Sequence, residues 1–130
     1  MQLKCLLDDS LALFEGFKSC HGMELLSSLY KESRKILHLQ YNGQCKVHFE
    51  HGDFTKNLSW LTYDVIFTNS ACFTIELQEK LRTLSKRLKP GCRFVTVGFQ
   101  LLMPETFLVL HDDDYAMSWG VCRVYIHVRI

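Results

Sequence analysis

The chain has 130 residues, of which 48% are hydrophobic and 22% are charged, and its formal net charge is +1. This length predicts one domain spanning residues 1–130 with a single core, and the balance of apolar and charged residues is typical of a soluble globular protein rather than a disordered or fibrous one. A net charge near zero also argues against direct, nonspecific nucleic-acid binding, because tight binding to phosphates needs a clustered basic surface.

The six cysteines are scattered without a Cys-x-x-Cys pair, and several lie in apolar, strand-like stretches. We therefore expect reduced thiols that pack in the core. The N-terminus contains Asp8 and Asp9 where a secretory signal needs an uninterrupted apolar stretch. No segment approaches the roughly 20 apolar residues of a membrane span. The expected compartment is the nucleus or the cytoplasm, with no membrane partner.

The first half of the chain has the pattern strand, helix, strand. Residues 17–26 end in an apolar run, and residues 27–40 then place apolar side chains at helical spacing. We expect this helix to stop at Asn42-Gly43. In residues 45–50 apolar and polar side chains alternate, which is the pattern of a strand with one solvent-exposed face at the edge of a sheet.

The second half continues the alternation and then departs from it. Residues 64–67 lack the polar positions of an edge strand and suit a strand covered on both faces, as do residues 93–97. Between them, an apolar stripe at helical spacing runs from Phe73 to Leu88 and ends at Pro90-Gly91. Residues 107–110 and 121–130 flank the polar stretch His111–Tyr115, which we interpret as the turn of an antiparallel pair.

Alternating strands and helices followed by a terminal hairpin predict an α/β fold, with a mostly parallel sheet and an antiparallel C-terminal hairpin. The carboxyl ends of successive parallel strands meet at one edge of such a sheet. Glu24, Asp53 and Asn69 all follow predicted strands, so we expect them at that edge, where α/β proteins bind ligands.

Five short segments carry a family resemblance. They are Gly22-Met23-Glu24, Gly52-Asp53-Phe54, Val65–Phe73 (VIFTNSACF), Ile75-Glu76-Leu77 and Lys89–Arg93 (KPGCR). In order and spacing they resemble the second half of a Rossmann-like class I S-adenosylmethionine-dependent methyltransferase. Within that class they resemble the disruptor-of-telomeric-silencing type of histone lysine methyltransferase, which lacks a SET domain. The resemblance covers about residues 22–130.

The resemblance implies the cofactor S-adenosylmethionine and a protein substrate, a histone or a nucleosome. It implies that Glu24 accepts from the ribose hydroxyls, that Asp53 accepts from the adenine amino group and that Phe54 covers the adenine ring. Asn69 would contact the cofactor where the methyl donor meets the acceptor amine, and Phe73 would line the channel for the acceptor lysine, which makes these two the expected catalytic residues.

Each polar candidate also has an ordinary structural explanation. Glu24 could be a solvated residue that favours the dipole of the following helix. Asp53 could accept hydrogen bonds from the backbone of its own turn, and Asn69 could simply form a turn.

One motif of the family is absent. A glycine-rich turn of the Asp-x-Gly-x-Gly kind should precede Glu24 by about two dozen residues, because glycines let the backbone approach the methionine part of the cofactor. Residues 3–16 offer a short strand and a helix with no glycine between them. Two explanations stay open: the chain is the C-terminal portion of a longer enzyme, or it is a degenerate relative, a catalytically inactive binding module or partner subunit.

Two further patterns suggest metals only superficially. His48 and His51 have the spacing of a ligand pair, but on a strand this spacing points them to opposite faces. Asp112–Asp114 lacks the glycine and the distal Glu of a calcium loop. We predict no metal site.

Overall fold

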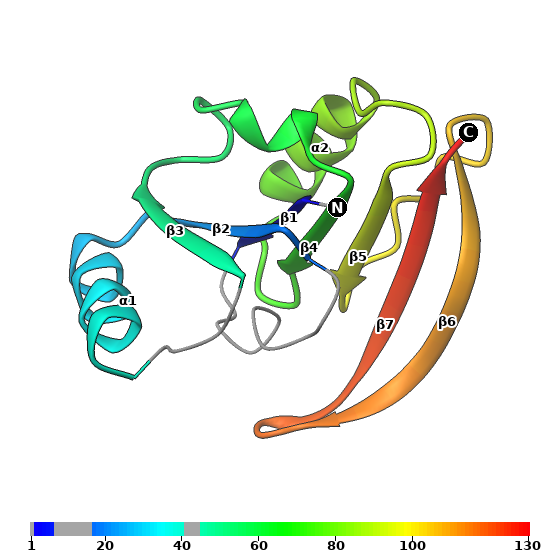
Figure 1. Cartoon of the computed structure of the whole chain (residues 1–130). Helices are drawn as coiled ribbons and strands as arrows, with labels where there is room; N and C mark the ends of the chain where they lie inside the picture. Colours follow the sequence, from blue (N-terminus) through cyan, green and yellow to red (C-terminus); the bar gives the residue numbers. More distant parts are fainter. Residues whose placement is uncertain (1, 7–16, 41–44) are drawn as a thin grey trace.

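A seven-stranded sheet runs through the computed structural model, which describes residues 2–6, 17–40 and 45–130 (Figure 1). The strand order is β3-β2-β1-β4-β5-β7-β6. β7 pairs antiparallel with β5 and β6, and the other described strand pairs are parallel. The strands are β1 (Gln2–Leu6), β2 (Ser19–Glu24), β3 (Lys46–His51), β4 (Val65–Asn69), β5 (Arg93–Val97), β6 (Phe107–Met117) and β7 (Gly120–Arg129). The predicted α/β fold with a C-terminal hairpin is confirmed.

Two helices cover opposite faces of this sheet (Figure 1). Helix α1 (Ser27–Gln40) connects β2 to β3, and α2 (Ile75–Ser85) connects β4 to β5. The two connections move in opposite directions along the sheet, so right-handed crossovers place their helices on different faces. The direction reverses between β1 and β4, and this reversal is where doubly wound sheets open a crevice beyond their strand ends.

Local sequence explains where α2 begins. The side chain of Thr74 accepts a hydrogen bond from the Leu77 backbone N–H, and Glu76 places a negative charge in the first turn. Leu81 and Ser85 are buried against the sheet. The predicted apolar stripe is therefore correct, although Phe73 and Leu88 lie just outside the helix.

The main core lies under α2. Trp60, Ile66, Leu81 and Phe94 are fully buried in it, and the segment that leads from β5 into β6 closes it with Leu101 and Phe107. A second, smaller cluster gathers Phe17, Cys45, Val47 and Val65 around Cys20 on the β2–β3 side of the sheet. The edge position predicted for residues 45–50 is confirmed by β3.

The predicted turn at His111–Tyr115 is wrong, because these residues lie inside β6 and the turn joins Met117 to Gly120. Asp112 and Asp114 can occupy a strand because both ion-pair with Arg123 of β7, each at 3.4 Å. Pairing with a cation on the neighbouring strand offsets the repulsion between the two carboxylates.

The structure corrects the expected burial of the cysteines and does not test the predicted end of the first helix. Cys72 is exposed rather than in the core, while Cys20 and Cys92 are buried and Cys45 and Cys122 are half-buried. The predicted helix stop at Asn42-Gly43 lies outside the described residues. In the part of the chain that the structure describes, no helix is long and apolar enough to cross a membrane.

Candidate functional site

The loop after β3 is built around the Asp53 side chain. Asp53 Oδ1 accepts hydrogen bonds from the Thr55 backbone N–H at 2.9 Å and from Thr55 Oγ1 at 2.7 Å. The Asp53 carbonyl accepts from the Asn57 N–H at 2.8 Å. The bonds from the Thr55 hydroxyl and backbone lower the pKa of Asp53, helped by the charges of Lys56 and Lys80. Asp53 is therefore an ionised side chain held in one orientation.

Glu24 ends β2 and is 8% exposed. Its Oε1 accepts from the Leu26 N–H at 2.7 Å, which satisfies a backbone donor at the start of α1. Its carbonyl accepts from the Gly52 N–H at 2.9 Å, so the loop carrying Asp53 is tied directly to the end of β2. One backbone contact thus brings the two predicted carboxylates to the same place.

Each carboxylate uses one oxygen for local structure. The turn explanation offered for Asp53 is correct for that oxygen. Glu24 does serve the start of α1 through Oε1, but it is buried and so is not the solvated residue of that explanation. Within the described residues, the other oxygen of Glu24 and of Asp53 accepts no hydrogen bond. A carboxylate has about four lone-pair sites on its two oxygens. Both side chains can therefore still accept hydrogen bonds from a ligand.

Two aromatic rings lie next to these acids. The rings of Phe54 and Phe73 stack nearly parallel, with their centroids 5.9 Å apart and an angle of 9° between their planes. The indole N–H of the fully buried Trp60 donates to the Phe54 carbonyl at 2.9 Å. Trp60 therefore anchors Phe54 to the core and fixes one wall of the site.

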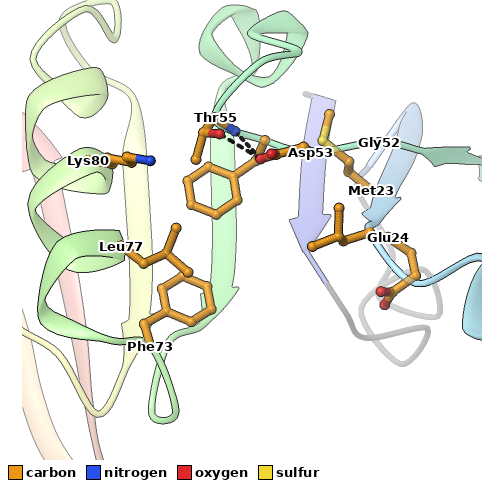
Figure 2. A pocket seen from close by; sticks show the side chains of 10 residues that line it. Met23, Glu24, Gly52, Asp53, Thr55, Phe73, Leu77 and Lys80 are labelled. Carbon is orange, nitrogen blue, oxygen red and sulfur yellow. Dashed lines mark hydrogen bonds between the residues drawn. The ribbon is translucent and has the colours of Figure 1, made fainter.

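Together these groups line a cavity of about 250 Å³ at the carboxyl ends of the strands. Figure 2 shows Met23, Glu24 and Asp53 on one side and Phe73, Leu77 and Lys80 on the other. Of the residues proposed from sequence, Glu24, Asp53, Phe54 and Phe73 all line this cavity. Asn69 ends β4, is half-buried and is not among the lining residues.

Sequence reasoning missed several residues of this wall. Leu77 lies one helical turn after Phe73, and Lys80 lies three residues further along the same helix, so the helical stripe could have indicated both. The Asp-Phe-Thr sequence is the pattern of a side-chain turn and could have identified Thr55. Met23 carried no signal, because an apolar residue at the end of a strand is commonplace.

The loop from β4 to α2 is fixed by close contacts with the end of β5. Ser70 is fully buried and its hydroxyl donates to the Val97 carbonyl at 2.9 Å. Gly98 has φ +74°, and a Cβ there would lie 2.9 Å from Ala71 Cα, so this position requires glycine. These contacts hold the backbone between Asn69 and Phe73.

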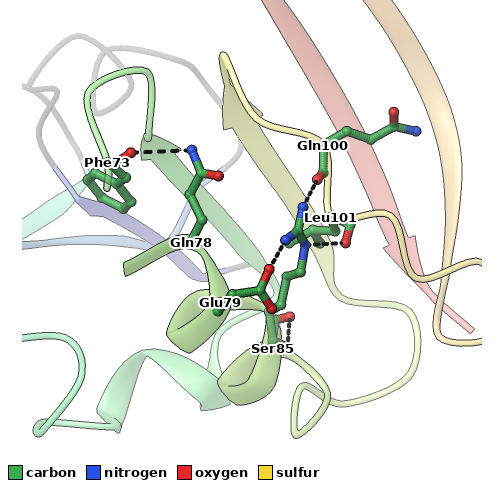
Figure 3. A network of polar contacts seen from close by, with 7 residues as sticks. Phe73, Gln78, Glu79, Ser85, Gln100 and Leu101 are labelled. Carbon is green, nitrogen blue, oxygen red and sulfur yellow. Dashed lines mark hydrogen bonds and ion pairs between the residues drawn. The ribbon is translucent and has the colours of Figure 1, made fainter. Parts of the chain in front are cut away.

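A polar network holds α2 against the segment after β5 (Figure 3). Arg82 donates to the carbonyls of Gln100 at 3.2 Å and Leu101 at 2.8 Å, and it also pairs with Glu79. The Gln78 side chain donates to the Phe73 carbonyl at 3.3 Å. Contacts at both ends of the loop from β4 to α2 therefore position Phe73, whose ring forms part of the cavity wall. No group of three or more potential metal ligands occurs among the described residues.

Residues 12–118 match the family model described as "Histone methylation protein DOT1". The chain belongs to the DOT1 family. A relative in Chaetomium globosum, named "Histone-lysine N-methyltransferase, H3 lysine-79 specific", is 31% identical in a 119-residue alignment that covers 81% of this chain and 21% of that protein. A relative of the same name in Gibberella zeae is 31% identical in a 90-residue alignment that covers 60% of this chain and 17% of the relative. The DOT1-family chain therefore spans about a fifth of the length of these relatives.

Solved structures confirm the class I methyltransferase fold of this DOT1-family chain. Magnesium protoporphyrin IX methyltransferase from Synechocystis PCC 6803, solved with bound S-adenosylhomocysteine, superposes with a TM-score of 0.73 at 12% identity, covering 99% of this chain and 74% of that one. N-methyltransferase NodS from Bradyrhizobium japonicum WM9 gives a TM-score of 0.72 at 10% identity, covering 98% and 84%. At these identities the likeness concerns the fold alone.

Proposed function

We propose that this chain binds S-adenosylmethionine in the cavity between β2, β3 and α2, and that it transfers the methyl group to a lysine of a histone. The observation that carries the proposal is the convergence of Glu24 and Asp53 beside Phe54 in a cavity at the carboxyl ends of the strands. Membership in the DOT1 family and the relatives named for histone H3 lysine 79 support the substrate class. A histone substrate also makes the nucleus the proposed compartment.

The residues of the cavity suit the adenosine part of this cofactor. Glu24 would accept from the ribose hydroxyls, and Asp53 would accept from the adenine amino group. Phe54, held by Trp60, would cover the adenine ring. Sites for drug-sized ligands measure roughly 300–1,000 Å³, so a cavity of about 250 Å³ suits a nucleoside portion rather than the whole cofactor.

The chemistry asks little of the protein beyond alignment. The cofactor, when bound, supplies a methyl group already activated on a sulfonium. The chain must then hold the acceptor amine in line with that group. A lysine amine has a reference pKa of about 10.4, and a partly desolvated aromatic surface such as that of Phe73 would favour its neutral form. Asn69 is proposed to contact both groups where they meet.

A noncatalytic role is the second candidate. It is favoured by the sequence of residues 3–16, which lacks the glycine-rich turn expected to approach the methionine part of the cofactor. Residues 7–16 lie outside the described part of the structure. Under this alternative the chain would bind the nucleoside or a partner protein without transferring a methyl group.

Titration of S-adenosylhomocysteine into the purified chain by calorimetry separates the candidates. We expect saturable binding to one site. Glu24→Gln keeps the shape of the side chain but loses its charge, so it should weaken binding by about 10-fold or more, as expected for a hydrogen bond to a charged group. Glu32→Gln is the matched control, because Glu32 lies on the exposed face of α1 and pairs only with Lys35 among the described residues.

A second assay follows methyl transfer from labelled S-adenosylmethionine to nucleosomes. Transfer that Glu24→Gln reduces and Glu32→Gln leaves intact is the expected result. Binding without transfer would favour the noncatalytic module. A lack of binding at high micromolar ligand, in a chain shown to be folded by circular dichroism, would contradict the cofactor site itself.

A further inference from the structure

Two cysteines meet at the end of the sheet that is remote from the cavity. Cys20 lies near the start of β2 and pairs in register with Val47 of β3, and Cys45 lies two residues before Val47. Because side chains alternate between faces, Cys20 and Cys45 point to the same side. Their sulfur atoms are 3.2 Å apart. A disulfide has a bond of about 2.05 Å, so a movement of roughly 1 Å would bring the sulfurs to bonding distance.

The two thiols differ in their surroundings. Cys20 is 4% exposed and packs against Phe17, Val47 and Val65. Burial raises the pKa of Cys20 to about 12, and the neighbouring Cys45 adds to this shift. Cys45 is half-buried and precedes the edge strand β3. An oxidant in solution can therefore reach Cys45, whereas Cys20 stays protonated behind it.

We propose that Cys20 and Cys45 form a dithiol pair that a peroxide oxidises reversibly to an intramolecular disulfide. The Cys45 thiolate attacks one oxygen of hydrogen peroxide, the O–O bond breaks, and Cys45 becomes a sulfenic acid while hydroxide leaves and takes up a proton as water. The Cys20 sulfur then attacks the Cys45 sulfur. The S–S bond forms, the S–O bond breaks, and the departing hydroxide takes the Cys20 proton as a second water.

The bond would tie the start of β2 to the start of β3 and close a loop that contains α1. Glu24 lies four residues further along β2, roughly 13 Å from Cys20 at the rise of a strand, so the cavity end of the strand is not altered directly. Closing a loop of this length restricts the unfolded chain. The oxidised protein should therefore melt on the order of 5–10 °C higher than the reduced protein.

Peptide mapping tests the pair directly. The reduced chain is treated with hydrogen peroxide, alkylated and digested with trypsin without a reductant. Cys20 falls in the peptide of residues 19–31, and Cys45 falls in the peptide of residues 36–46. We expect these two peptides to appear linked, with a mass two hydrogens below their sum, and to separate again after dithiothreitol treatment.

Three variants decide the outcome. Cys45→Ser and Cys45→Ala should both abolish the linked peptide and the rise in melting temperature. Cys72→Ser should keep both, because Cys72 is exposed in the loop between β4 and α2. A linkage of Cys20 or Cys45 to another cysteine, or oxidation of Cys45 to a sulfinic acid without a linked peptide, would overturn the proposal. A mapped bond with an unchanged melting temperature would also overturn it, because the bond would then not join the two strands in the folded state.

Discussion

Among the residues that the structure describes, the two faces of the sheet differ in how much apolar surface they bury. Under α2, Trp60, Ile66, Leu81 and Phe94 are fully buried and pack as one cluster. On the β2–β3 side, Cys20 is the buried residue of its cluster, and the described neighbours around it are partly exposed. The stability of the fold should therefore come mainly from the α2 side. Glu24 and the cysteine pair lie on the β2–β3 side, where fewer apolar contacts are buried and local opening therefore costs less free energy.

The largest effect should come from truncating the α2 side. Phe94 is fully buried and contacts Trp60, with ring centroids 6.2 Å apart. Phe94→Ala should lower the free energy of unfolding by about 3–5 kcal/mol, because it leaves a cavity that the rigid neighbours cannot fill. Urea denaturation measures this loss. Leu29→Ala on the exposed face of α1 should change the free energy by no more than about 0.5 kcal/mol. Equal losses of free energy for the two variants would contradict the claim that the stability comes mainly from the α2 side.

The second effect depends on pH and comes from His127 on β7. His127 is 1% exposed, its Nε2 accepts from the Leu101 N–H at 3.3 Å, and its Nδ1 lies 3.0 Å from the Phe94 carbonyl. This arrangement suits a neutral ring that carries its proton on Nδ1.

Burial lowers the pKa of His127 in the folded state, although the bond to Phe94 opposes the shift. The unfolded chain, with a His pKa of about 6.5, therefore binds the proton first as the pH falls. The contribution of His127 to the free energy of unfolding should be fully present above pH ~6.5. As the pH falls below this value, the free energy should drop by up to about 1.4 kcal/mol per pH unit. Urea denaturation at pH 7.5, 6.5 and 5.5 measures this slope. His127→Gln should lose this part of the slope, whereas His111→Asn, at a half-buried position on β6, should retain it. A slope that survives in His127→Gln would assign the effect to another group.

A smaller change in the free energy of unfolding is expected on the β2–β3 side. Val47 is half-buried beside Cys20, so Val47→Ala removes methyl groups that are only partly shielded from water. We expect a loss of about 1 kcal/mol, measured by the same denaturation in the reduced protein. A loss as large as that of Phe94→Ala would show that the β2–β3 side carries more of the core than its burial indicates.

The sequence could predict those parts of the fold that leave a local pattern. Strands and helices with strong patterns, such as the apolar stripe from Phe73 to Leu88, were located closely because periodicity reflects burial. The interpretation of Asp112–Asp114 as a turn was wrong, because three consecutive acidic residues resemble a turn and Arg123, the partner of Asp112 and Asp114, lies on another strand. An ion pair between strands leaves no local pattern in the sequence, so only the fold could reveal it.

The candidate site was predictable only in part for the same reason. Glu24, Asp53 and Phe54 stand in short motifs that can be recognised one by one. Their meeting depends on the contact between the Gly52 N–H and the Glu24 carbonyl, which joins residues far apart in the chain. The stacking of Phe73 on Phe54 likewise needs the α2 loop to be in place. Sequence could propose these residues but could not show that Phe73 and Phe54 share one wall.

The most direct test of the proposed adenosine site is its location by NMR. Amide chemical shifts of the ¹⁵N-labelled chain would be followed during titration with S-adenosylhomocysteine. We expect the largest, saturable shifts at Gly52, Asp53 and Leu77 around the cavity, and none at the hairpin turn near Trp119. Shifts confined to residues remote from the cavity, or no shifts at millimolar ligand, would contradict the account.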